Sequence, residues 1–205
     1  MSKEWTSSEG FERLVREHQG MVFRTLTRLT GPGAQVEDLA QEVFLRLYRA
    51  LPEFRGTAML STYLYRIVYN VAQDEWKRRR RERERFGPEP SGFEDDEPGE
   101  WMENQPGDLR SGEHNRTPEE VVSDTETQAA VEAALLDLPE AERAVLVLFH
   151  SEDLSYEGIA AALGLPLNTV RTHLHRGRKR LAELVTKRLA RQTRPTEAST
   201  QAGNQ

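Results

Sequence analysis

A short stretch near the C-terminus carries the side chains best suited to reading duplex DNA. Amide, hydroxyl, imidazole and guanidinium groups follow one another at Asn168, Thr169, Arg171, Thr172, His173, Arg176, Arg178, Lys179 and Arg180. Such groups donate hydrogen bonds to phosphates and to base edges in the major groove. On a helix, we expect Asn168, Arg171 and Thr172 to point deepest and the later arginines to meet phosphates. The alternative is a basic amphipathic helix whose charges are merely solvated.

The residues around this stretch predict the element that positions it. Ser155 can cap a first helix, and Gly164 follows that helix where a left-handed backbone costs least. Asn168 or Thr169 would cap a second helix. The apolar residues that both helices would bury are Ile159, Ala160, Leu163, Val170 and Leu174. This pattern is typical of a helix-turn-helix, whose second helix enters the major groove.

A second segment interleaves aromatic, cationic and amide side chains. Its members are Leu60, Tyr63, Tyr65, Arg66, Tyr69 and Asn70, and seven cations follow between Lys77 and Arg85. Aromatic rings stack on unpaired bases, and cations follow the phosphate backbone of a single strand. The residues are equally consistent with tyrosines in a core and an arginine run at a solvated helix end.

Polar side chains also gather on one face of a predicted helix over residues 36–51. They are Glu37, Asp38, Gln41, Glu42 and Arg46, and they lie away from the apolar stripe. Such a face is most often solvated surface, and a protein partner is the alternative.

No pattern in the sequence points to catalysis, a cofactor or a metal. The chain has no cysteine, which excludes thiol chemistry, disulfides and zinc–thiolate sites. We find no Gly-rich phosphate loop, metal-ligand cluster or nucleophile–base signature. His173 and His175 are two residues apart on a predicted helix and face different directions, which is poor metal geometry. We therefore predict a protein that binds rather than catalyses, without cofactor or metal.

Apolar residues at three- and four-residue intervals predict an all-α fold. Three helical patterns fill residues 1–86, the first ending at Gly31-Pro32-Gly33 and the second at Pro52. Four more follow at about 119–137, 139–150, 155–163 and 167–186, and together they form a four-helix helix-turn-helix domain.

The distribution of charge separates these two small domains. Residues 1–86 carry a net charge of +4 and residues 158–205 carry +7, whereas 87–118 carry −7 and 119–157 carry −10. Residues 87–118 hold five prolines and nine acids with few aliphatic residues, so they cannot bury enough apolar surface to fold. We expect a flexible acidic linker that separates the two DNA-binding surfaces in the free chain, and a disordered tail over 187–205.

From the hydropathy pattern we expect a cytoplasmic protein. No apolar run approaches the roughly 20 residues that span a bilayer, and residues 1–10 lack the apolar core of a signal peptide.

Two groups of motifs resemble those of extracytoplasmic-function sigma factors. The first group resembles their second conserved region and comprises Glu37–Phe44, Phe54–Gly56, Tyr63–Ile67 and Asn70. The second resembles their fourth region and comprises Leu138–Glu140, Leu154–Tyr156, Ile159–Ala160, Leu163–Gly164 and Thr169–Arg171. The resemblance covers about residues 10–86 and 119–186, in the family's order.

The resemblance implies an RNA polymerase specificity subunit that binds the core enzyme and two promoter elements. Residues implied in binding the clamp helices of the beta-prime subunit are Asp38, Gln41, Glu42 and Leu45. Residues implied at the minus-ten element are Phe54, Arg55, Leu60, Tyr63, Arg66, Asn70, Arg78 and Arg79. Residues implied at the minus-35 element are Asn168, Thr169, Arg171, Thr172, His173, Arg176 and Arg178. The C-terminal domain would also pack on the flap of the beta subunit.

The sequence departs from the family at positions that set specificity. Tyr63 stands where members usually have Trp, which keeps a stacking ring, and Asn168 replaces a common Gly. Family members are commonly held inactive by an anti-sigma factor, often at the membrane, so we expect such a partner. Two rival hypotheses are a stand-alone helix-turn-helix regulator, which leaves the 54–85 segment unexplained, and an enzyme.

Overall fold

The computed structural model describes residues 5, 7–54, 60–86 and 118–192, and all regular elements among them are helical. In chain order these are α1 (Ser8–Thr30), α2 (Gln35–Ala50), the 3-10 turn η1 (Leu51–Glu53), α3 (Leu60–Phe86), α4 (Pro118–Leu136), α5 (Glu140–His150), α6 (Tyr156–Leu163) and α7 (Leu167–Gln192). The predicted all-α fold is confirmed. None of these helices combines the length and the apolar character needed to span a bilayer.

The first three helices form an N-terminal domain whose limits follow from local chemistry. Ser7 caps α1 by accepting a hydrogen bond from the Gly10 amide at 3.1 Å. Gly31 ends the helix with φ +87°, a backbone angle that residues other than glycine rarely adopt. The residues that α1, α2 and α3 bury together include Leu14, Val22, Leu26, Val43, Leu47, Leu64 and Val68.

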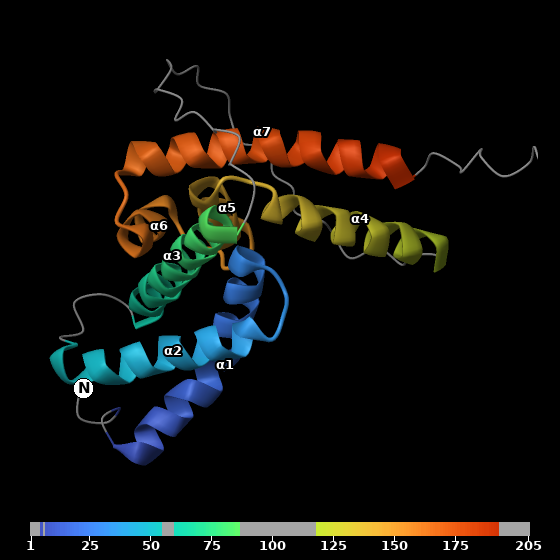
Figure 1. Ribbon diagram of the computed structural model, residues 1–205. Helices are drawn as coiled ribbons and strands as arrows, with labels where there is room; N and C mark the ends of the chain where they lie inside the picture. Colours follow the sequence, from blue (N-terminus) through green and yellow to red (C-terminus); the bar gives the residue numbers. More distant parts are fainter. Residues whose placement is uncertain (1–4, 6, 55–59, 87–117, 193–205) are drawn as a thin grey trace, which may run out of the picture.

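The last four helices form a C-terminal domain built around α5. The middle of α5 is apolar on every side, as expected for a helix buried all round, and its buried run is Ala144, Val145, Leu146, Val147 and Leu148. α7 packs on α4, α5 and α6. In Figure 1, α7 lies along the top with α4 beneath it, and α1 and α2 lie at the opposite end.

Two predictions about α7 are wrong. The helix begins at Leu167, so Asn168 and Thr169 belong to its first turn and do not cap it. It also continues to Gln192, so residues 187–192 are helical rather than part of a disordered tail. The continuation is explained by α4, because α7 packs along that helix. The predicted linker 87–118 lies outside the described residues except for Pro118, the first residue of α4, and residues 193–205 lie outside them too.

The two domains pack against each other. α6 lies against α3, and both α5 and α4 lie against α1. Figure 1 shows α3 running from the N-terminal helices into the C-terminal domain. Leu136 at the end of α4 reaches Gly31 at the end of α1, where a Cβ on the glycine would be 3.5 Å from its Cδ1. The buried apolar residues of both domains form one continuous cluster.

Candidate nucleic-acid and polymerase interfaces

The helix-turn-helix predicted at 155–180 is confirmed. Ser155 accepts a hydrogen bond from the Gly158 amide at 3.1 Å and caps α6. Gly164 ends α6 in the left-handed conformation, with φ 68° and ψ 31°. Val170 and Leu174 are buried on the inner side of α7. The end of α6 at Gly164 and the start of α7 at Leu167 are separated by a short turn, which fixes the angle between the two helices.

An outward stripe on α7 is formed by the exposed residues Asn168, Arg171, His175 and Lys179. Their spacing of three and four residues places them on one face of a helix. Asn168 and Arg171 were predicted to point outward, and they do. Lys179 was among the cations predicted to contact DNA, whereas His175 was not, although extending the helical spacing from Asn168 would have found it.

Other predicted contacts of α7 lie beside this stripe rather than on it. The Thr172 hydroxyl donates to the Asn168 carbonyl at 2.9 Å, so its hydrogen is used within the helix. His173 is half-buried, and burial together with nearby Arg176 lowers its pKa, so the imidazole is neutral at pH 7. Thr169 is also half-buried.

Arg178 is held against α5. Its Nε donates to Nε2 of His150 at 3.2 Å, and its guanidinium lies 5.0 Å from the centre of the Phe149 ring. Burial and the positive charge of Arg178 lower the pKa of His150, which keeps the ring nitrogen available as an acceptor. Arg178 is thus fixed in position next to the outward stripe.

The predicted minus-ten residues divide into an exposed row and a half-buried group. Arg66 and Asn70 are exposed and four residues apart on α3, so they share a face. Tyr63 and Phe54 are half-buried and pack ring to ring, with centroids 5.3 Å apart. Leu60 is also half-buried, whereas Arg55 lies outside the described residues.

Two of the tyrosines that could have stacked on bases belong to the core instead. Tyr65 and Tyr69 are buried, and Tyr69 packs edge-on against Trp76 with ring centroids 6.1 Å apart. Of the two interpretations open for this segment, the core is correct for these two rings, and Tyr63 alone keeps partial exposure.

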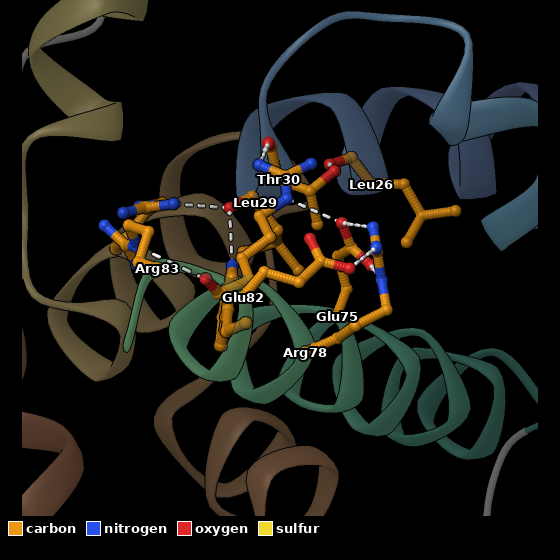
Figure 2. A network of polar contacts seen from close by, with 10 residues as sticks. Leu26, Leu29, Thr30, Glu75, Arg78, Glu82 and Arg83 are labelled. Atoms are coloured by element: carbon orange, nitrogen blue, oxygen red, sulfur yellow. Dashed lines mark hydrogen bonds and ion pairs between the residues drawn. The ribbon is translucent and has the colours of Figure 1, made fainter. Parts of the chain in front are cut away.

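The arginines that follow on α3 are held by a buried acid, Glu75, whose side chain is 4% exposed. Arg78 donates to both of its carboxylate oxygens at 2.8 and 2.9 Å, and Arg79 donates to Oε1 at 2.6 Å. Figure 2 shows Glu75 between Arg78 and the end of α1. Burial opposes ionisation of Glu75, but the two guanidinium groups outweigh it and hold its pKa below the ordinary value.

Arg79 also links α3 to the end of α1, because its Nη1 donates to the Thr30 carbonyl at 2.7 Å. The last carbonyls of a helix have no partner within it and attract cations. Arg78 and Arg79 were both predicted to contact DNA. Arg79 also joins two helices of the N-terminal domain, whereas Arg78 is 56% exposed and pairs with acids of its own helix.

The predicted polymerase-binding residues lie on one side of α2. Asp38, Gln41 and Leu45 are exposed at helical spacing, and Tyr48 extends the same row. Leu45 and Tyr48 are 49% and 52% exposed, which is unusual for large apolar side chains. Sequence reasoning missed Tyr48, which packs edge-on against Phe11 with centroids 5.0 Å apart.

Glu42 stands apart from this row. It is half-buried and accepts a hydrogen bond from Arg46 at 2.7 Å, and Arg46 in turn reaches Asp74 of α3 at 2.9 Å. Glu42 therefore helps to join α2 to α3. The row that remains open to a partner is Asp38, Gln41, Leu45 and Tyr48.

Comparisons with known proteins agree with both halves of this arrangement. Residues 14–82 match sigma-70 region 2, and residues 128–181 match sigma-70 region 4. The chain is 32% identical to the RNA polymerase sigma-H factor of Pseudomonas aeruginosa, over 82% of each protein. It is 33% identical to the extracytoplasmic-function sigma-E factor of Escherichia coli, over 83% of this chain and 84% of that one. The chain therefore belongs to the sigma-70 family.

Within that family it belongs to the extracytoplasmic-function group. The chain is 36% identical over 86% of its length to the sigma factor SigE of Mycolicibacterium smegmatis, of which it spans 62%. Solved structures that share its fold include two complexes. One is the sigma factor RpoE with the anti-sigma factor NepR from Bartonella quintana, with TM-score 0.60, 20% identity and coverage of 86% and 96%. The other is CnrH with the cytosolic domain of CnrY, with TM-score 0.61, 21% identity and coverage of 91% and 95%.

Proposed function

We propose that this chain is a sigma factor that binds core RNA polymerase and directs it to promoters. The observation that carries the proposal is the outward stripe of α7, Asn168, Arg171, His175 and Lys179, presented by a capped helix-turn-helix. A cation and an amide near the start of such a helix can form paired hydrogen bonds with base edges in the major groove. This stripe reads the minus-35 element, with Thr169, Thr172, His173, Arg176 and Arg178 beside it.

The N-terminal domain acts at the minus-ten element. Arg66 and Asn70 face solvent on α3, and Tyr63 offers a ring edge supported by Phe54. Flipping a base out of a duplex costs a few kcal/mol, and stacking it on an aromatic ring returns about 1–3 kcal/mol. One supported ring thus offsets a large part of the cost of holding one flipped base, and phosphate contacts add salt-dependent affinity. Arg78 and Arg79 contribute positive potential there while they stay paired to Glu75.

The core enzyme binds the row of Asp38, Gln41, Leu45 and Tyr48 on α2. Two exposed apolar side chains beside two polar ones give an apolar centre with a polar rim, the usual anatomy of a protein interface. The occupant is the pair of clamp helices of the beta-prime subunit, and the C-terminal domain sits on the beta flap. This role requires no catalysis and places the protein with DNA in the cytoplasm.

An anti-sigma factor is a further partner. One structural relative was solved with such a protein, the anti-sigma factor NepR, and another with the cytosolic domain of CnrY. In this chain the anti-sigma factor would cover the polymerase-binding row, and it could be anchored in the membrane.

The test is promoter-directed transcription with purified core polymerase. The wild-type chain is expected to give transcripts from defined genomic starts, and Asp38→Arg with Gln41→Arg to lose core binding in a pull-down. Glu12→Arg, at an exposed position of α1, is the matched control and keeps core binding. Specific duplex binding without polymerase, together with no transcript, would favour a stand-alone regulator instead.

A further inference from the structure

The last two residues of α5, Phe149 and His150, contact a single arginine of α7. The Phe149 ring meets the His150 imidazole edge-on, with centroids 4.9 Å apart, and lies 5.4 Å from the Tyr156 ring of α6. The guanidinium of Arg178 lies over the same Phe149 ring, 5.0 Å from its centre. Side chains from three helices therefore meet in one cluster, which consists of Phe149, His150, Tyr156 and Arg178.

A single hydrogen bond fixes the direction of the Arg178 guanidinium within this cluster. Its Nε donates to Nε2 of His150 at 3.2 Å, while the plane of the group lies over Phe149. Within the described part of the chain, its two Nη groups make no hydrogen bond. A guanidinium is a planar fork of N–H donors. The donors on Nη1 and Nη2 are therefore left to bind the oxygens of a phosphate.

The position of Arg178 along α7 suits a phosphate contact. It stands seven residues after Arg171, which is about two helical turns further along the same side. At about 1.5 Å per residue, the two side chains leave the helix about 10 Å apart along its axis. The major groove is about 12 Å wide. When Arg171 faces base edges, Arg178 therefore lies near the phosphates that border the groove.

The acceptor that holds Arg178 is lost when His150 takes up a proton. Neutral imidazole has one accepting nitrogen, whereas both nitrogens of imidazolium donate. Burial and the charge of Arg178 lower the pKa of His150, and Asp153 opposes them. α1 also packs on α5, but its Arg24 lies beside Glu152. The contact is therefore complete at pH 7 and is lost as pH falls below 6.5, the ordinary value for histidine.

We propose that His150 is a positioning residue for DNA binding. In its neutral form it holds Arg178 in the orientation that binds a phosphate at the border of the minus-35 major groove. Fixing a flexible side chain before binding removes part of the entropy that binding otherwise costs. The inference rests on the proposed sigma function for the identity of the DNA element, and it makes this phosphate contact depend on the charge of His150.

The test measures binding of the full-length chain to a labelled duplex that the wild-type chain selects from a random-sequence pool. Fluorescence anisotropy at pH 8 compares the wild type with three variants. Arg178→Ala should weaken binding about fivefold and lower the salt dependence by about one phosphate contact. His150→Ala should weaken binding about threefold because the guanidinium loses its hydrogen bond. His150→Gln should stay within about twofold of the wild type, since its amide oxygen still accepts.

A double variant separates positioning from a loss of stability. If His150 acts only through Arg178, adding His150→Ala to Arg178→Ala should cause no further loss of affinity, because the effects of two residues in one contact are not additive. A general defect in folding would instead multiply the two losses. Each variant should keep the wild-type helical signal in circular dichroism.

The pH profile of binding distinguishes positioning from packing. Lowering the pH from about 8 to about 5.5 should weaken wild-type binding about threefold relative to His150→Gln, which takes up no proton at this position. Both proteins keep His173 and His175, so the ratio of their affinities removes the contribution of these two residues. His18→Gln, on α1 and outside the cluster, is the matched control and should keep the wild-type profile.

Three results would overturn the positioning role and leave the sigma function standing. His150→Ala could bind like the wild type, or the two losses could multiply in the double variant. The wild type could also bind more tightly than His150→Gln at low pH, which would make protonated His150 a phosphate contact itself. If the variants behave as expected but the chain supports no promoter-directed transcription with core polymerase, the sigma function fails and the positioning role stands. A wild-type chain that selects no duplex contradicts both.

Discussion

The two arginine-rich helices, the second half of α3 and the whole of α7, look alike in sequence and differ in what their cations contact. In α3, Arg78 and Arg79 share the buried carboxylate of Glu75. Arg80 lies 3.3 Å from the carboxylate of Glu140, at the start of α5 in the C-terminal domain. In α7, Arg171 lies on the exposed side of the helix. Density of positive charge therefore does not identify a DNA-reading helix.

The arginines of α3 differ from those of α7 because a buried acid precedes them by about one helical turn. Glu75 precedes Arg78 and Arg79 by three and four residues, the spacing at which side chains meet on a helix. α7 has one acid, Glu183. Arg178 and Arg180 are held from α5 instead, Arg180 by Glu142 at 3.2 Å. That leaves the first turns of α7 open to a ligand.

The largest expected effect comes from removing the acid that organises α3. Glu75→Ala should destabilise the N-terminal domain by about 3 kcal/mol, because it leaves Arg79 partly buried against a helix end without its partner. Glu82→Ala removes an acid that also pairs with Arg78 but is 53% exposed, and should cost about 0.5 kcal/mol or less. Urea unfolding of both variants measures the difference. If both variants lost the same free energy of unfolding, Glu75 would matter no more than an exposed acid, and the proposed difference between α3 and α7 would be wrong.

The same acid should make stability depend on pH. Burial disfavours the charged form of Glu75, but hydrogen bonds from Arg78 and Arg79 outweigh it, so the folded pKa lies below the unfolded one. A lowered carboxylate pKa contributes stability that is complete above the unfolded value, near 4.5, and is lost as pH falls through the folded value. The free-energy gap between wild type and Glu75→Gln should therefore be largest at neutral pH and shrink as pH falls below the unfolded pKa, near 4.5. A gap that does not change with pH would contradict this.

For affinity to promoter DNA, a substitution in α7 should have a larger effect than one in α3. Arg171→Ala should weaken binding to a promoter duplex by about tenfold, or about 1.4 kcal/mol, because a cation at the start of a recognition helix contacts base edges. Arg79→Ala should lower the unfolding temperature while leaving affinity for a minus-35 duplex unchanged. Fluorescence anisotropy with both variants measures this. A larger affinity loss for Arg79→Ala would reverse the assignment of the two helices.

Local features of the fold were predictable from the sequence, and contacts over long separations were not. Ser155 and Gly164 fix the helix-turn-helix through bonds and angles within a few residues, so their types predict it. The core position of Tyr65 depends on the other domain, because Tyr65 contacts Glu152, 87 residues away. Helical spacing alone says that an aromatic faces a given side, and not whether a distant helix covers that side.

The candidate sites show the same limit. Asn168, Arg171 and Leu45, all named as contacts, are exposed, and helical spacing could have added His175 and Tyr48. The involvement of Arg78 and Arg79 with Glu75 was also within reach, because i,i+3 and i,i+4 spacing predicts ion pairs on a helix. The burial of Glu75, which makes those pairs matter, required the position of α1.

The smallest effect compares a glycine in the middle of one helix of each domain. Gly20 of α1 is exposed, and a Cβ there would meet only the end of the Arg24 side chain at 3.4 Å. Gly20→Ala should therefore stabilise the chain by about 0.5–1 kcal/mol through helix propensity alone. Gly177 of α7 is buried, and a Cβ there would lie 2.9 Å from Leu146 Cδ1 and 3.3 Å from Glu142 Cβ.

At Gly177 the gain in propensity is opposed by overpacking of the α5–α7 contact, which typically costs about 1–3 kcal/mol. Gly177→Ala should thus destabilise the chain by about 1 kcal/mol, the opposite sign from Gly20→Ala, in thermal unfolding. It should also weaken duplex binding, because a shift of α7 away from α5 moves Arg178 off His150 and Phe149. Stabilisation by both alanines would show that α7 has room to move on α5, and that its arginines are placed less firmly than those of α3.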